Sequence, residues 1–477
     1  MSHDHTRRDF LKISGLGAAA AAVVADARSL AATSEAGSSG DISVWTTDES
    51  QRMKQGPSVA WRPATGAASP DDIVLNVAEK FQPILGFGAA FTDAACYTFN
   101  RLDPTVREKL FHEMFHPSEM GLSVCRTCIG SSDYSASLYS FDEGDPDPDL
   151  TRFSIDHDRA YILPMLREAR KANPDLFLFS SPWSPPGWMK PNGSMLGGCM
   201  HRKYFDAYAN YFVKFLQGYA AEGVPVHAVT VQNEVDTEQD GRMPACSWPM
   251  EYEIDFVRQF LGPAFERERV RTKIWIIDHN YNLWGRALAE LETADLHKYT
   301  NAIAWHGYVG KPEWMMRVQD KYPDLEMYWT EGGPDYTSPD YASDWAKWGQ
   351  TFTDVLRNGC RSITGWNLAL DERGKPNIGP FSCGGVVTIH SQTKEISYSG
   401  QYWALAHYSR FIRRAARRVG SQGAPALSHA AFENSNGERV LVVANSGAAG
   451  RVDVRHGKTQ ATIALPANCL ATLQWSA

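Results

Sequence analysis

The chain has 477 residues, of which 43% are hydrophobic and 21% charged, the composition of a globular protein longer than one average domain. Its formal net charge is -8, and its one cluster of basic residues lies at 410–418. Nucleic acid is therefore excluded as a partner, because binding it requires many cationic side chains to neutralise phosphates. The cluster has helical spacing, and we interpret it as the solvated or ion-paired face of a helix.

The first 31 residues have the pattern of an export signal. Arg7 and Arg8 precede the sequence FLK, and a short apolar run follows that is too brief to span a bilayer. The pattern resembles a twin-arginine signal peptide. We predict that residues 1–31 engage the twin-arginine export machinery, that the mature protein is periplasmic or secreted, and that it has no stable membrane anchor.

The eight cysteines leave the thiol chemistry open. Export permits disulfides, whereas a protein that is exported folded can also keep buried, reduced thiols. Cys125 and Cys128 have the spacing of a metal-binding pair, but no second pair accompanies them. The surrounding run reads as a strand, which would place the two thiols on opposite faces. We predict no metal site there.

Eight apolar, strand-like runs follow a linker that is rich in serine and glycine. They lie at 83–91, 122–130, 176–186, 226–234, 273–280, 301–308, 326–333 and 361–370. Amphipathic helical patterns separate most of them, at 105–115, 159–172, 202–223 and 251–268. Eight strands that alternate with helices predict an α/β fold, a (β/α)8 TIM barrel that we place at 81–407.

The two ends of the chain predict a second domain. A helix at 400–414 is expected to close the barrel, and from there the apolar residues alternate every second position between Gly and Asn-Gly turns. We predict a β-sandwich over 408–477. The short strands expected within 32–80 are predicted to join it, so that a side β-sandwich domain is built from both chain ends.

The predicted strand exits carry unusual side chains for buried strands. Active sites of this architecture lie at the carboxyl ends of the strands. The exit residues, mostly acids, amides and aromatics, are Gly88, Asp93, Arg126, Asp133, Trp183, Asn233, Glu234, Asp278, His279, Asn280, His306, Tyr308, Glu331, Trp366 and Asn367. Glu234 ends the fourth strand and Glu331 the seventh, so the two carboxylates are expected to converge across the barrel mouth.

Two facing carboxylates are what cleavage of a glycosidic bond requires. One protonates the leaving oxygen while the other attacks the anomeric carbon, and a separation near 5 Å would indicate the retaining route. We expect Arg126 to keep Glu331 ionised as the nucleophile. Glu234, as the acid, needs a raised pKa.

The remaining exit residues suggest how a sugar is held. Trp183, Trp305 and Trp366 offer flat apolar faces on which a sugar ring can stack, and Asn233 can bond the 2-hydroxyl group.

His306 and Tyr308 are expected to orient Glu331. No second histidine with ligand spacing accompanies His306, so we do not expect it to bind a metal. For residues 278–280 the sequence leaves two roles possible: structural hydrogen bonding at the barrel rim, or contact with the substrate. The acidic run that follows Glu234 is interpreted as a solvated loop.

Several ordered motifs resemble glycoside hydrolase family 30, the glucosylceramidase family. They are QPILGFGAAFTDAA, RTCIGSSDYS, SSPWSPPGWMK, VTVQNE, IIDHNY, WHGY, TEGG and GWNLALDERGKPN, and the resemblance runs from about Trp45 to the C-terminus. It implies a barrel with a side β-sandwich and a retaining β-glycosidase mechanism that needs no cofactor. By position, Glu234 is similar to the family's acid/base and Glu331 to its nucleophile. The residues similar to its sugar-pocket positions are Arg126, Asp133, Trp183, Asn233, His306, Tyr308 and Trp366.

Two departures bear on the substrate. Gly365 stands where animal glucosylceramidases carry an acid, and the loop after Asn377 diverges. We predict hydrolysis of β-glucosides, with a β-linked oligosaccharide or a glycolipid such as glucosylceramide as the binding partner. A β-xylosidase, a β-fucosidase or a β-1,6-glucanase on the same scaffold remains open, as does a non-catalytic glycan-binding surface protein.

Overall fold

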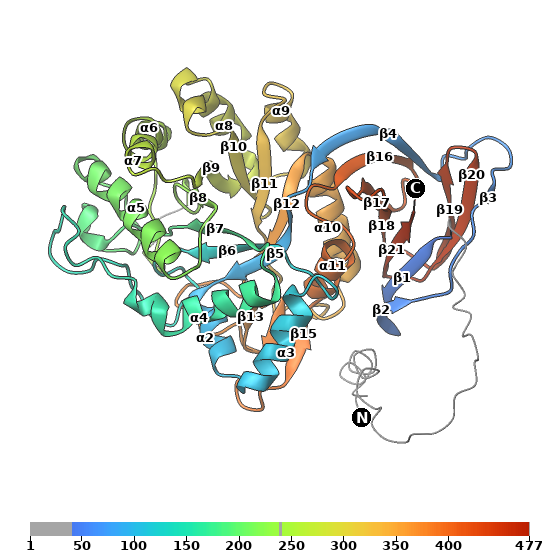
Figure 1. Cartoon of the computed structure of the whole chain (residues 1–477), viewed down its shortest axis with the longest axis horizontal. Coiled ribbons are helices and arrows are strands. Elements are labelled where there is room, and N and C mark those ends of the chain that lie inside the picture. The colour runs from blue at the N-terminus through green and yellow to red at the C-terminus, as the bar shows by residue number, and fades with distance from the viewer. Residues whose placement is uncertain (1–40, 238–240, 477) are drawn as a thin grey trace, which may run out of the picture.

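The computed structural model describes residues 41–237 and 241–476 (Figure 1). The predicted signal at 1–31 lies outside the described residues. Within the described ranges, no helix combines the length and the apolar character needed to cross a membrane. All eight cysteines are free thiols, and Cys125 and Cys128 are both buried.

Eight parallel strands close into a barrel, confirming the predicted α/β architecture. They are β5 (Gly86–Phe91), β6 (Val124–Cys128), β7 (Phe177–Ser181), β8 (Ala228–Thr230), β9 (Lys273–Asn280), β10 (Ala302–His306), β11 (Glu326–Glu331) and β12 (Cys360–Gly365). Each overlaps one of the predicted apolar runs. The runs are apolar throughout because the strands are covered on both faces, by helices outside and by side chains within.

Helices cover the outside of the barrel (Figure 1). They are α2 (Asp93–Asn100), α3 (Pro104–Phe115), α4 (Asp156–Ala172), α5 (Phe205–Ala221), α6 (Met250–Asp255), a π-helical turn η4 (Phe256–Leu261), α7 (Gly262–Arg267), α8 (Trp284–Leu291), α9 (Met316–Gln319), α10 (Trp345–Arg357) and α11 (Gly400–Ser409). The four helical patterns in the sequence are all helical here. The start of α3 shows why: the Asp103 side chain accepts from Thr105 N, and Pro104 occupies the first turn.

The basic cluster at 410–418 is not a helix face, so that interpretation was wrong. Helix α11 ends at Ser409, and the chain turns into β16 (Arg417–Gly423). The Arg410 guanidinium lies 4.6 Å from the centre of the Trp45 ring, and Arg413 donates to a backbone carbonyl. Arginine can bond several carbonyls at once with its planar fork of donors, so these residues fasten loops.

The second domain is a ten-stranded sheet that draws strands from both ends of the chain, as predicted. Its strands are β1 (Ser43–Asp48), β2 (Gln51–Gln55), β3 (Arg62–Pro63), β4 (Ile73–Pro83), β16, β17 (Ser428–Glu433), β18 (Arg439–Asn445), β19 (Gly450–His456), β20 (Thr459–Leu465) and β21 (Cys469–Trp475), in the order β2-β1-β21-β18-β17-β16-β4-β19-β20-β3. Helices α10 and α11 lie between this domain and the barrel (Figure 1). His407 of α11 bonds Thr47 of β1 and Thr472 of β21.

A small sheet extends the exit of β12 towards the barrel mouth. It consists of β13 (Ala369–Leu370), β14 (Val387–Ile389) and β15 (Ile396–Tyr398). The long connection between β13 and β14 is therefore anchored at both ends. This connection contains the divergent loop after Asn377.

Candidate active site

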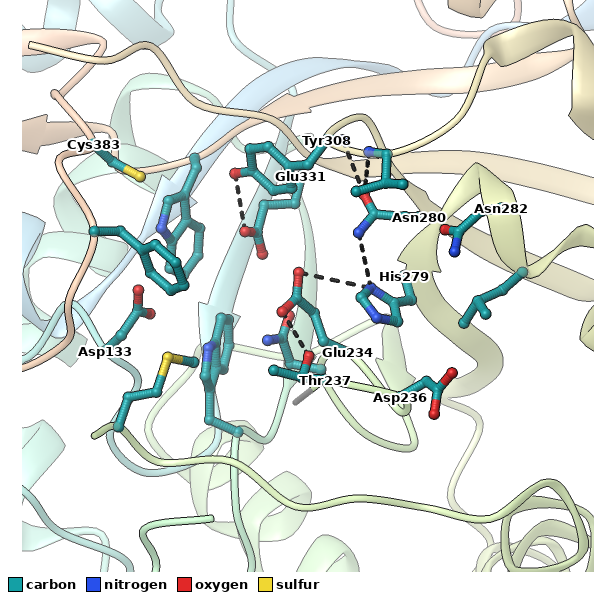
Figure 2. Close-up of a pocket in the computed structure, with 17 residues that line it drawn as sticks. Asp133, Glu234, Asp236, Thr237, His279, Asn280, Asn282, Tyr308, Glu331 and Cys383 are labelled. Atoms are coloured by element: carbon teal, nitrogen blue, oxygen red, sulfur yellow. Dashed lines mark hydrogen bonds and ion pairs between the residues drawn. The ribbon is translucent and has the colours of Figure 1, made fainter. Parts of the chain in front are cut away.

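A pocket of about 440 Å³ opens at the carboxyl ends of the barrel strands (Figure 2). Its lining is Asp133, Trp183, Asn233, Glu234, Asp236, Thr237, Met243, His279, Asn280, Asn282, Leu283, Tyr308, Val309, Glu331, Trp366, Phe381 and Cys383. The two predicted catalytic glutamates belong to this lining, as do all the predicted sugar-pocket positions except Arg126 and His306. Those two are fully buried directly behind the carboxylates.

Glu234 enters the pocket from the turn after β8. Its backbone has a φ of 55°, an unusual value for a non-glycine residue, and its N–H donates to Asp278 O at 2.9 Å. Oε2 accepts from the Thr237 hydroxyl at 2.7 Å, and Oε1 lies 3.2 Å from His306 Nδ1. Thr237 belongs to the run interpreted as a solvated loop, so its contact with Glu234 was missed.

Glu331 ends β11 on the opposite side of the pocket. Its Oε2 accepts from Arg126 Nη1 at 2.5 Å. Figure 2 shows the other contact, in which Oε1 accepts from the Tyr308 hydroxyl at 3.1 Å. Tyr308 thus contacts Glu331, the partner expected for it. His306 lies 3.8 Å from Glu331 but hydrogen-bonds Glu234 and Asp278, so its main contacts are not the expected ones.

Asp278 is the centre of the buried network beneath both carboxylates. It is completely buried and accepts a charge-assisted bond from Arg126 Nη2 at 2.7 Å. Its other partners are Ser181, Thr230, Thr330 and His306. A buried carboxylate is tolerated only when paired in this way. Of the two readings left open for Asp278, the structural one applies.

A local distortion of β9 aims Asp278 into the barrel. Ile277 and Asp278 have φ values of 74° and 43°. The freed N–H of Ile277 donates to Glu253 Oε1 at 3.0 Å, and Arg286 holds the other oxygen of Glu253 at 2.9 Å. Glu253 lies on α6, so a helix outside the barrel stabilises the strand that carries the network.

The charges around the two glutamates do not follow the expected pattern. Burial raises the pKa of Glu331, although His306 and Arg126 oppose it. Burial acts on Glu234 as well, but His306 and His279 outweigh it and lower its pKa to about 2. Burial disfavours the His306 cation, yet the surrounding carboxylates, Glu331 first, raise its pKa to about 9. The expectation of a raised pKa at Glu234 was therefore wrong, whereas Arg126 acts on the pKa of Glu331 in the expected direction and is outweighed by burial.

Two of the three predicted tryptophans form one wall of the pocket. Trp183 and Trp366 stack with ring centres 5.0 Å apart, and the Arg126 guanidinium lies 4.7 Å from the Trp183 ring. Trp305 is completely buried against Tyr281 and lies outside the lining, so its predicted sugar contact was wrong. It alternates with His306 along β10, so its side chain points outward to the helices.

Asp133 offers a polar atom to the pocket. It is 4% exposed, and its Oδ1 is buried with no hydrogen-bond partner. Burial, together with Glu331 and Glu234, raises its pKa well above the usual range, which favours a neutral carboxyl group.

The divergent loop encloses the Asp133 side of the pocket. Ile378 N donates to Asp133 O at 2.8 Å, and the Tyr134 hydroxyl donates to Phe381 O at 3.0 Å. The loop contributes Phe381 and Cys383 to the lining. The sequence identified this loop only as a departure, without assigning these two residues to the site.

Gly365 leaves little space for a larger residue. A Cβ atom there would lie 2.8 Å from Gln401 Oε1, and Gln401 Nε2 donates to Gly332 O at 2.9 Å, next to Glu331. Gln401 therefore occupies the space beside this strand exit. An acidic residue at 365 would have to displace it.

Comparison with known proteins places the chain in a family. Residues 84–412 match the glycosyl hydrolase family 30 TIM-barrel domain and 416–473 the β-sandwich domain of that family. Residues 4–24 match a twin-arginine translocation pathway signal sequence, which indicates export.

Named relatives carry two activities. The chain is 32% identical to an endo-1,6-beta-D-glucanase of Neurospora crassa (76% of this chain, 79% of the relative) and 27% identical to the lysosomal acid glucosylceramidase of Mus musculus (78% and 77%). It superposes on a solved endo-β1,6-glucanase with a TM-score of 0.84 at 29% identity, covering 92% of this chain and all of the other. The chain thus belongs to glycoside hydrolase family 30, as an exported member.

Proposed function

We propose that the protein is a retaining β-glycosidase that hydrolyses β-glucosides by double displacement. The observation that carries this proposal is the pair of carboxylates that enter one pocket from β8 and β11. They have different partners: Glu331 accepts bonds from Arg126 and Tyr308, whereas Glu234 contacts His306 and Thr237. Such asymmetry suits one fixed nucleophile and one group that exchanges a proton.

In the first step, a Glu331 oxygen attacks the anomeric carbon and the bond to the leaving oxygen breaks. Glu234 gives that oxygen a proton. In the second step, Glu234 takes a proton from water, which attacks the same carbon and releases Glu331. Arg126 and Tyr308 hold Glu331 in line for attack on the anomeric carbon.

His306 has a proposed part in the supply of the proton. Its Nε2 lies 3.0 Å from Asp278, and its Nδ1 lies 3.2 Å from Glu234. The contact between His306 and Glu234 holds one proton, which can reside on Nδ1 or on Oε1 without changing the total charge of the pair. The low pKa of Glu234 is therefore compatible with its acid role, because His306 stores the proton within hydrogen-bond reach.

Three groups are proposed to recognise the sugar ring. Asn233 Oδ1 accepts from Arg126 Nη2 at 2.8 Å, which leaves the Asn233 amide hydrogens to donate to a hydroxyl group. The unpartnered Oδ1 of Asp133 supplies a second contact. The Trp183–Trp366 wall supplies an apolar face on the same side.

For the aglycone we propose a β-1,6-linked glucan as the first candidate. Its support is the naming of relatives at 32% and 29% identity as endo-1,6-β-glucanases. A specific observation favours glucosylceramide as the second candidate. Tyr308, Val309 and Phe381, which are 45%, 51% and 51% exposed, all line the pocket. Exposed apolar side chains at a pocket mouth suit an amphiphilic substrate.

A panel of substrates tests this proposal. Aryl β-glucoside, β-xyloside, β-fucoside and β-galactoside report the sugar, and β-1,6-glucan and glucosylceramide in detergent micelles report the aglycone. We expect the glucoside to be the best aryl substrate and β-1,6-glucan to be cleaved faster than the lipid. Proton NMR of the first-formed sugar should show the β anomer. An α anomer would contradict double displacement, and a preference for xyloside or fucoside would replace the glucoside assignment.

A further inference from the structure

Three potential metal ligands meet at one side of the pocket. They are Glu234 Oε1, His279 Nδ1 and His306 Nδ1, which all lie within 4.8 Å of one another. The glutamate oxygen is 3.2 Å from the His306 nitrogen and 3.7 Å from the His279 nitrogen. Figure 2 shows the His279 ring turned towards Glu234. Zinc bonds of about 2.0–2.1 Å in a tetrahedral site place neighbouring ligands about 3.3 Å apart, so the His306 contact has the required spacing and the His279 contact is longer.

His279 Nδ1 is a hydrogen-bond acceptor on the side that faces Glu234. The Asn280 amide is fixed in orientation, because its Oδ1 accepts from the backbone N–H groups of Tyr308 at 2.9 Å and Val309 at 3.1 Å. Its NH2 group must then face His279 Nδ1, which lies 3.3 Å away. Nδ1 is therefore the unprotonated ring nitrogen. The Nδ1 lone pair accepts from Asn280 over a long contact of 3.3 Å, and a cation between Nδ1 and the carboxylate oxygen of Glu234 would replace that hydrogen bond.

The other two ligands are already oriented by partners behind them. His306 lies with Nε2 3.0 Å from Asp278, the carboxylate–histidine pairing typical of metal sites, so Nδ1 faces Glu234. Glu234 Oε2 is held by the Thr237 hydroxyl, which leaves Oε1 for a metal. Glu234 and His279 line the pocket, so water from the pocket can complete the coordination.

We propose that Glu234, His279 and His306 form a reversible site for a divalent transition-metal ion of the zinc and cobalt class. Two imidazoles and one carboxylate suit such ions, whereas magnesium and calcium prefer oxygen ligands alone. A bound ion displaces to solvent the proton that His306 Nδ1 and Glu234 Oε1 share, takes the place of that proton on Oε1 and so competes with substrate. Metal binding at this site does not depend on the proposed glycosidase function. Only the predicted inhibition by the metal depends on that function.

Visible absorption of the full chain titrated with Co²⁺ tests the binding. We expect d–d bands of the intensity typical of four- or five-coordinate cobalt, displaced by Zn²⁺ and unaffected by excess Mg²⁺. His279→Ala should weaken Co²⁺ binding by about 100-fold or more, since even the loss of a partner behind a ligand costs 10–100-fold. His279→Gln serves as a second variant if the alanine protein does not fold.

A matched control uses a histidine that does not belong to the pocket lining. His201 lies in the connection between β7 and α5, and His201→Ala should bind Co²⁺ as the unmodified protein does. Bands that persist unchanged in both His279 variants would overturn the proposal, as would the absence of bands at millimolar Co²⁺.

Inhibition supplies a separate readout. Zn²⁺ should raise the KM for an aryl β-glucoside without changing kcat, and the effect should be lost in His279→Gln. If the protein shows the cobalt bands but Zn²⁺ changes neither kcat nor KM, the metal binds without competing with substrate. That result would overturn the proposed competition and leave the metal site in place. Absence of any glycosidase activity would contradict the proposed function and leave the cobalt result as the test of the site.

Discussion

The barrel interior has two layers that differ sharply although the same strands build them. Towards the amino ends of the strands the interior is apolar, with Trp275 stacked on Tyr328 at 4.1 Å between ring centres. The other members of this layer are Val124, Phe179, Ala228, Ala302 and Ala304. One step further along, the inward residues are polar: Arg126, Ser181, Thr230, Asp278, His306 and Thr330.

The difference teaches how this fold separates stability from chemistry. Inward side chains recur every second residue, so Val124 is followed by Arg126 and Ala304 by His306. On β9 the polar residue comes three positions after Trp275, because the distortion at Ile277 adds a residue. The apolar layer excludes water beneath the network, and the polar layer keeps its charges paired.

The largest effect is expected at the polar layer's outer edge. Glu331→Gln removes the proposed nucleophile and should lower kcat by about 10⁴-fold or more, while thermal unfolding stays close to that of the unmodified protein. Steady-state assays on an aryl β-glucoside check this. Glu268→Gln, at an exposed position far from the pocket, is the control. Near-normal turnover in Glu331→Gln would refute the assignment.

Glu234→Ala should have the next largest effect. Loss of the acid/base group should lower kcat by about 10²–10⁴-fold on substrates with poor leaving groups, and less on aryl glycosides with good ones. Azide should restore turnover and yield a β-glycosyl azide, detectable by mass spectrometry. If azide gives no rescue with any substrate, the acid/base role is contradicted.

Trp275→Ala should separate the two layers. It removes the centre of the apolar layer, so we expect the free energy of unfolding to fall by about 3–5 kcal/mol. Chemical denaturation followed by circular dichroism measures it. The folded fraction should retain its KM, because Trp275 does not line the pocket. A large loss of activity without loss of stability would contradict the separation.

The smallest effect concerns a buried acid outside the barrel. Burial raises the pKa of Asp158, on α4, to about 7, although Tyr219, His157 and Tyr139 oppose it; Asp93 adds to the rise. Since the folded state then binds the proton that the unfolded chain releases near pH 4, stability should fall as pH rises from about 4 to 7, by up to about 1.4 kcal/mol per pH unit.

Asp158→Asn should flatten that part of the pH profile relative to the unmodified protein. Denaturation at several pH values between 4 and 8 measures the difference. Parallel profiles for the two proteins would show that Asp158 does not titrate in this range.

Much of the fold follows from local patterns. Eight apolar runs and the helices between them give the barrel, because each run is short, buried and separated by amphipathic segments. The distortion of β9 at Ile277 leaves no such pattern, since the backbone turns there are stabilised by Glu253 from a helix. The helix predicted for the basic cluster was wrong for a related reason. The arginines keep a helical spacing after Ser409, although the helix itself ends there.

The order and ends of the strands were enough to predict that the two glutamates reach the same face of the barrel. Glu234 and Glu331 follow buried strands, and the carboxyl ends of parallel strands meet at one face. Only the tertiary structure decided how these residues pair. His306 turns to Glu234 and Asp278, Thr237 joins the site from a loop, and Trp305 points away. Those choices depend on strand register and on charges brought together from distant segments, and a one-dimensional pattern records neither.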